Sequence, residues 1–86
     1  MKETYAGARA RLLSQLAMHG WTTAPQLKVP WAESPDKTIK LWFKAQAVYL
    51  DSHSLFIDMR GMAVETLIAT AARTNVIRRD IERTFG

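Results

Sequence analysis

The spacing of apolar residues changes twice along this chain of 86 residues. Near the N-terminus and again in the last third, apolar side chains recur every three or four positions, which is typical of helices with one buried side. Between these segments they alternate with polar residues, which is typical of strands with one buried face. A chain of this length forms one domain around one core. The pattern therefore predicts a single α+β domain over residues 1–86.

The first helical segment predicts a helix over residues 2–19 that ends at Gly20, which can adopt the left-handed conformation of a helix C-terminus. Its apolar stripe comprises Tyr5, Ala8, Leu12, Leu13 and Leu16. A second helix is expected to begin near Ala63. Its buried stripe comprises Val64, Leu67, Ile68 and Ala71.

Continuing this second stripe at 3.6 residues per turn would place Asn75 and Arg78 in the core. Polar side chains are rarely buried without partners. We therefore expect a break at residues 74–75, followed by a short C-terminal helix that uses Ile77, Ile81 and Phe85.

The alternating middle of the chain predicts a three-stranded antiparallel sheet. Its strands are expected at residues 27–31, 38–44 and 55–59, with turns at 33–37 and 51–54, and a bulged continuation of the second strand to residue 50 stays open. The element order is then α-β-β-β-α with the short extra helix. One face of the sheet would lie under both helices. That face comprises Leu27, Val29, Trp31, Ile39, Leu41, Phe43, Leu55, Ile57 and Met59.

The opposite face of the predicted sheet combines cations with two large aromatic side chains. Its candidate binding residues are Lys28, Lys40, Trp42, Lys44, Phe56 and Arg60. Exposed aromatic residues among charges are typical of a binding platform for a protein or for nucleic-acid bases. Two alternatives stay open, in which the terminal helix or a second copy of the chain covers this face. In that case the binding surface should be sought on the helices, beginning with Arg9, Arg11, Arg78 and Arg79.

The chemistry of an enzyme is not evident in the sequence. The absence of cysteine excludes thiol catalysis and cysteine zinc sites. Residues 51–54 contain the side-chain types of a hydrolytic triad, but a triad assembles from separate elements, so these residues predict a polar turn. We expect no catalytic residue, no metal site and no cofactor.

The charge balance suggests what the module binds. Twelve Lys and Arg against eight Asp and Glu leave a net charge of +4. This surplus is modest for a strong grip on phosphates, whereas Trp, Phe, Met and Arg are enriched in protein interfaces. We expect a protein partner, with a small basic DNA- or RNA-binding domain as the alternative and a homodimer left open. No apolar run is long enough to span a membrane, so a cytoplasmic protein with no membrane partner is expected.

The predicted element order over residues 2–73 resembles the double-stranded RNA-binding domain in topology. That resemblance implies two helices on one face of a three-stranded sheet. The family binds RNA with lysines at the start of its second helix, but this segment of the chain (residues 62–66) has Glu65 and no lysine. The RNA-binding activity is therefore not carried over.

Three segments, residues 27–31, 41–49 and 57–62, are similar to small uncharacterised proteins of bacterial, phage and mobile-element genomes. By analogy, this resemblance implies an inhibitor, encoded by a phage or mobile element, that binds a host defence complex as anti-CRISPR proteins do. Such a protein would act in the host cytoplasm.

Overall fold

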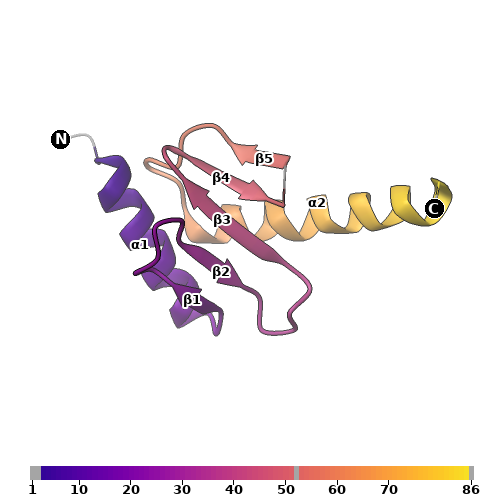
Figure 1. Ribbon diagram of the computed structural model, residues 1–86, viewed down its shortest axis with the longest axis horizontal. Helices are drawn as coiled ribbons and strands as arrows, with labels where there is room; N and C mark the ends of the chain where they lie inside the picture. The colour runs from indigo at the N-terminus through magenta and orange to yellow at the C-terminus, as the bar shows by residue number, and fades with distance from the viewer. Residues whose placement is uncertain (1–2, 52, 86) are drawn as a thin grey trace.

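The computed structural model describes residues 3–51 and 53–85. Over these residues two helices accompany a five-stranded antiparallel sheet in which each strand pairs with the next along the chain (Figure 1). The elements are α1 (Tyr5–Met18), β1 (Thr22–Ala24), β2 (Trp31–Glu33), β3 (Lys40–Lys44), β4 (Ala47–Leu50), β5 (His53–Phe56) and α2 (Val64–Phe85).

The ends of α1 follow from local chemistry. The Thr4 hydroxyl caps the helix by accepting a 3.0 Å hydrogen bond from the Gly7 amide. At the other end Gly20 has φ 87°, and the Trp21 amide donates to the Leu16 carbonyl at 3.0 Å. The first predicted helix is therefore confirmed over Tyr5–Met18, including its glycine stop, whereas Glu3 and Thr4 precede the helix and residue 2 lies outside the described residues.

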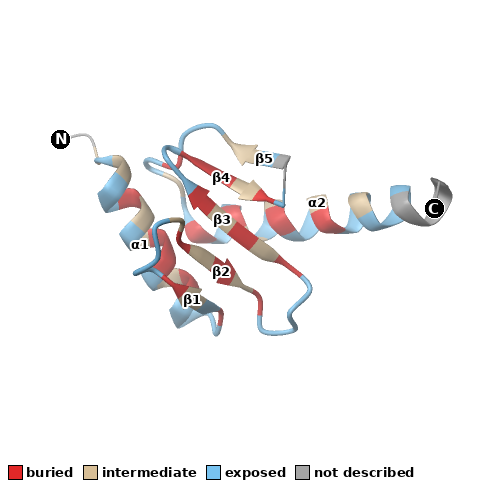
Figure 2. Ribbon diagram, in the orientation of Figure 1, coloured by how far each residue is buried: buried red, intermediate tan, exposed pale blue. Residues whose placement is uncertain are grey.

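Side chains of both helices and of one sheet face form a single core, and Figure 2 marks the buried residues in red along the helices and strands. On β3 the predicted alternation is confirmed, because Leu41 and Phe43 are buried while Lys40 and Trp42 are only half-buried. The largest fully buried side chains are Phe43, Leu12, Leu16, Leu41, Leu50, Met59, Leu67 and Val48.

The prediction of three strands was wrong. The segment 38–50 is a hairpin, in which a two-residue turn at Ala45 and Gln46 separates β3 from β4. Ala45 has φ 49°, and the lack of a glycine there conceals the turn in the sequence. The extra edge strand β1 has the sequence Thr-Thr-Ala and therefore carries no alternating apolar pattern.

The first predicted strand was displaced along the chain. Strand β2 comprises Trp31–Glu33, whereas the predicted strand comprised residues 27–31. Leu27, which was expected in the core, is 47% exposed. A shift of this kind changes which residues face the core. Ala32 is fully buried, whereas Trp31 points to the other face of the sheet.

The third predicted strand was displaced as well. Strand β5 ends at Phe56, and Ile57, expected in the core, is 76% exposed. Phe56, expected on the outer face, is the Cα partner of the buried Val48 and packs against the core. The register shifts between Val48 and Tyr49, and such an irregularity is not evident from alternation alone.

The expected break near residue 75 and the separate terminal helix are also wrong, because α2 continues from Val64 to Phe85. Asn75 is buried, and its side-chain oxygen accepts a 3.1 Å hydrogen bond from Arg78 Nη2. Arg78 in turn forms an ion pair with Asp51. These contacts give the polar residues partners within the helix and at the sheet. The C-terminal half of α2 projects beyond the strands (Figure 1).

Candidate binding surface on the outer sheet face

Three aromatic side chains form a row across the outer face of the sheet. Trp31 of β2 lies opposite Trp42 of β3, and Trp42 lies opposite Tyr49 of β4. Directly opposed residues of neighbouring strands project to the same face, so the three side chains are neighbours. All three are half-buried, on the face opposite the helix-covered core. We call these three residues the aromatic row.

Two lysines lie against the aromatic row. The Lys40 ammonium lies 4.3 Å from the ring centroid of Trp31 and 4.7 Å from that of Trp42. The Lys44 ammonium lies 5.7 Å from the ring centroid of Tyr49. A cation at such distances is attracted by the ring quadrupole. The ammonium groups are therefore part of the aromatic surface.

Acidic residues border the same surface. Glu33 lies opposite Lys40 in the register of β2 and β3. A shallow hollow of about 350 Å³ is lined by Val29, Trp42, Lys44 and Asp51. The outer face therefore combines a central aromatic area with both signs of charge at its margins.

Of the six residues predicted for this surface, Lys40, Trp42 and Lys44 lie together on it. Lys28 is exposed in the segment between β1 and β2. Phe56 lies on the core side of the sheet, as described above. Arg60 follows β5, where its guanidinium forms an ion pair with Asp58 at 2.6 Å.

Arg60 is also part of the contacts near the N-terminus, because its guanidinium carbon lies 4.2 Å from the Tyr5 ring centroid. The neighbouring Asp58 accepts hydrogen bonds from the Arg60 side chain and backbone, which lower the pKa of its carboxyl. These contacts explain why Arg60 is held away from the aromatic row.

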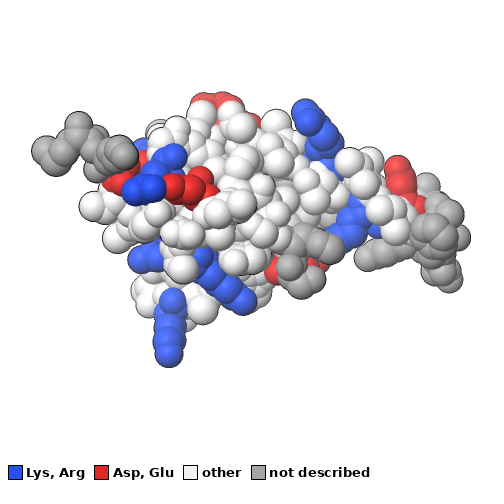
Figure 3. Space-filling view, turned by 90° about the horizontal axis from the view of Figure 1, so that it is seen from above, with Lys and Arg blue, Asp and Glu red and all other residues white. Residues whose placement is uncertain are grey.

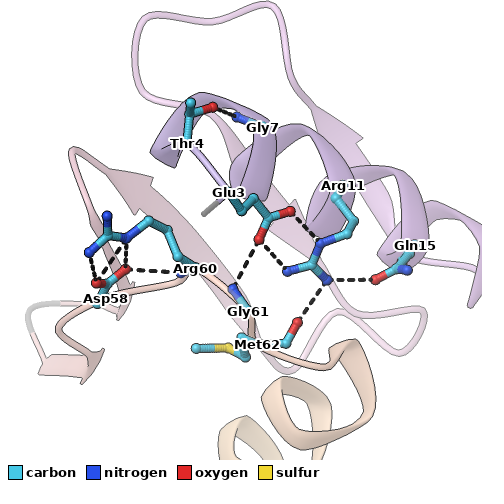
Figure 4. A network of polar contacts seen from close by, with 9 residues as sticks. All are labelled: Glu3, Thr4, Gly7, Arg11, Gln15, Asp58, Arg60, Gly61 and Met62. Atoms are coloured by element: carbon cyan, nitrogen blue, oxygen red, sulfur yellow. Dashed lines mark hydrogen bonds and ion pairs between the residues drawn. The ribbon is translucent and has the colours of Figure 1, made fainter. Parts of the chain in front are cut away.

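The four arginines predicted as secondary candidates have different surroundings. Arg9 on α1 is half-buried, and Arg79 on α2 is exposed. Arg78 is engaged with Asp51. Arg11 joins α1 to the segment before α2, because it binds Glu3 at 2.7 Å and the Met62 carbonyl at 2.7 Å (Figure 4).

The Glu3 carboxylate completes this connection. It accepts hydrogen bonds from Arg11 and a 2.9 Å hydrogen bond from the Gly61 amide. The Arg11 hydrogen bonds, and after them that of Gly61, lower the pKa of Glu3 from 4.5 to about 2. Arg11 thus has a structural role in the described part of the chain.

Trp31 and Tyr49 were not predicted for this surface. The alternation of Leu27, Val29 and Trp31 instead predicts that Trp31 lies in the core. A two-residue turn at residues 45–46 would have placed Tyr49 opposite Trp42, but Ala-Gln is not a favoured turn pair.

Figure 3 shows Lys and Arg side chains in separate groups around a largely uncharged middle in that view.

Within residues 3–51 and 53–85, no cluster of three or more potential metal-binding side chains occurs. In the same part of the chain, no helix has the length and apolar character needed to cross a membrane. No family model, curated protein or solved structure matches the chain.

Proposed function

We propose that this protein is a non-enzymatic binding module whose outer sheet face binds another protein. The observation that supports the proposal is the aromatic row, which lies half-buried on the face opposite the core. Trp and Tyr are the residues that most often dominate the binding energy of protein interfaces. Partner residues packed over the row would remove its remaining exposed surface from water.

The details of the surface favour a protein over a nucleic acid. Single-stranded nucleic acids bind where bases stack on free rings along a positively charged groove. Here the Lys40 ammonium already lies over Trp31 and Trp42, and a base would have to displace it. Glu33, which lies opposite Lys40, further reduces the attraction for phosphates.

We further propose, from the resemblance expected for residues 27–31, 41–49 and 57–62, that the partner is a component of a host defence complex. The small protein would inhibit this target by covering a functional surface. The comparisons with known proteins do not bear on this extension, whereas the binding face rests on the aromatic row.

The test is affinity capture from a lysate of the host cell, treated with nuclease. We expect a stoichiometric protein to be retained by the native chain and lost with Trp42→Ala. The matched control is Met18→Ala, which removes an exposed apolar side chain of α1, outside the sheet, and should retain the partner. Thermal melts verify that both variants fold.

Two results would contradict the proposal. One is a partner that Trp42→Ala binds as tightly as the native chain does. The other is release of all bound material by nuclease, which would favour the DNA- or RNA-binding alternative. That alternative also predicts binding to single-stranded DNA or RNA that weakens several-fold as salt rises to physiological concentration.

A further inference from the structure

The C-terminal half of α2 has an apolar surface that the rest of the chain leaves exposed. Ile77 and Ile81 are each 53% exposed, although Val64, Leu67 and Ala71 of the same helix are buried. Most of the stability of a protein helix comes from packing of an apolar side, and an uncovered half-helix lacks that support. A further element packed there would supply it.

The exposed isoleucines belong to a regular stripe. Thr70 and Thr74 precede them on the same side of α2 and are half-buried, so the spacing between stripe residues is four, three and four. This is the spacing of the contact positions in a pair of supercoiled helices. We call the four residues the α2 stripe.

The charges beside the α2 stripe indicate which helix fits it. Arg73 and Asp80 are exposed, and each directly precedes a stripe residue, so both lie on the same flank of the stripe. In an antiparallel helix pair, equivalent flanks of the two helices face each other. Another α2 with its stripe apposed in the antiparallel direction would place Asp80 beside the partner's Arg73.

We infer that α2 binds α2 of a second copy of this chain as an antiparallel pair along this stripe. Ile77 of each copy then packs against Thr74 of the other, and Ile81 against Thr70. Twofold symmetry produces the ion pair between Arg73 and Asp80 twice. A parallel pair would instead bring Arg73 close to Arg78 of the other copy, which is already paired with Asp51, so Arg73 would gain no acidic partner there.

The interface is short. The stripe from residue 70 to residue 81 extends over about 16 Å at 1.5 Å per residue. The buried area should fall below the roughly 1,200 Å² of a standard stable complex. We therefore expect a weak dimer that forms at tens to hundreds of micromolar protein.

Sedimentation equilibrium from about 5 to about 500 µM tests the inference, since a dimer in this affinity range raises the weight-average mass steadily from near that of the monomer toward that of the dimer. We expect Ile77→Asp to remain monomeric throughout. The matched control is Val76→Asp, because Val76 is 57% exposed but lies about 100° around the helix from Ile77. It should associate like the native chain. A native chain that is monomeric at every concentration, or an equal loss in both variants, would overturn the inference.

Charge exchange tests the direction of the helices. Arg73→Glu and Asp80→Arg should each weaken self-association at least tenfold, since each places like charges together twice. An equimolar mixture of the two variants should restore association, because every pair across the interface is again of opposite sign. Failure of the mixture to associate would rule out the antiparallel arrangement.

A further variant separates this interface from the proposed binding face. Trp42→Ala alters the outer sheet face and should leave the dimer unchanged. Loss of self-association in Trp42→Ala would place the contact on the sheet and overturn the inference. Circular dichroism and thermal melts verify that every variant is folded.

Discussion

Asp51, in the turn between β4 and β5, forms an ion pair with Arg78 in the second half of α2. The contact joins the turn after β4 to the part of α2 that follows Ala71, the last residue of the predicted buried stripe. It also explains how α2 continues past Asn75, because Arg78 donates to the Asn75 side chain and is half-buried there. The ion pair thus positions the base of the projecting half-helix.

Removing the charge of Asp51 should lower stability. Asp51 has φ 55°, and asparagine tolerates this conformation, so Asp51→Asn changes little besides the charge. Arg78 would then lack its ion pair, and its buried Nε has no hydrogen-bond partner among the described residues. We expect a loss of about 1 kcal/mol in the free energy of unfolding, measured with urea. Equal stability of Asp51→Asn and the native chain would contradict the explanation.

The observed strand register predicts which aliphatic residues support the core. Leu41 is fully buried, and Leu41→Ala should lower the free energy of unfolding by about 2–5 kcal/mol. Ile57 is 76% exposed, and Ile57→Ala should cost less than about 0.5 kcal/mol. Chemical denaturation of the two variants measures both values. A large loss in Ile57→Ala would support the strand register expected from alternation alone.

The turn between β3 and β4 offers a stabilising substitution. Ala45 has φ 49°, a conformation that is unfavourable for residues with a Cβ atom. Ala45→Gly removes this strain but increases the entropy of the unfolded chain. We expect a net gain of about 0.5–1 kcal/mol, seen as a higher melting temperature. The control is Ala72→Gly on the exposed side of α2, which should destabilise by roughly the same amount.

The hydrogen bonds of Glu3 predict a stability change in acid. Its pKa is lowered from 4.5 to about 2 in the folded state, so the contribution of the charged carboxylate is fully present above pH 4.5. It is lost as the pH falls from 4.5 toward 2. Glu3→Gln should therefore melt at a lower temperature than the native chain at neutral pH, and the difference should shrink in this acidic range. A difference that is constant from pH 7 to pH 2 would exclude a role for the Glu3 charge.

Local sequence determined the features that depend on short-range chemistry. The stop at Gly20 follows from the backbone freedom of glycine, and α1 follows from an apolar stripe that needs no distant partner to be recognised. The outward position of Trp42 follows in the same way, because it lies between two side chains that must be buried, Leu41 and Phe43. In these features the observed structure agrees with the prediction.

Tertiary structure alone decided how the strands meet and that α2 continues unbroken past Asn75. Alternation assigns faces within one strand, but it does not determine which residue of the next strand lies opposite, so Trp31 and Tyr49 became neighbours of Trp42 only through pairing. Likewise, the polar residues that predicted a break in α2 are stabilised by Asp51, which another part of the chain supplies. The physical reason is common to both cases. Strand register and the partners of buried polar groups depend on contacts between residues far apart in the sequence, and local patterns do not contain them.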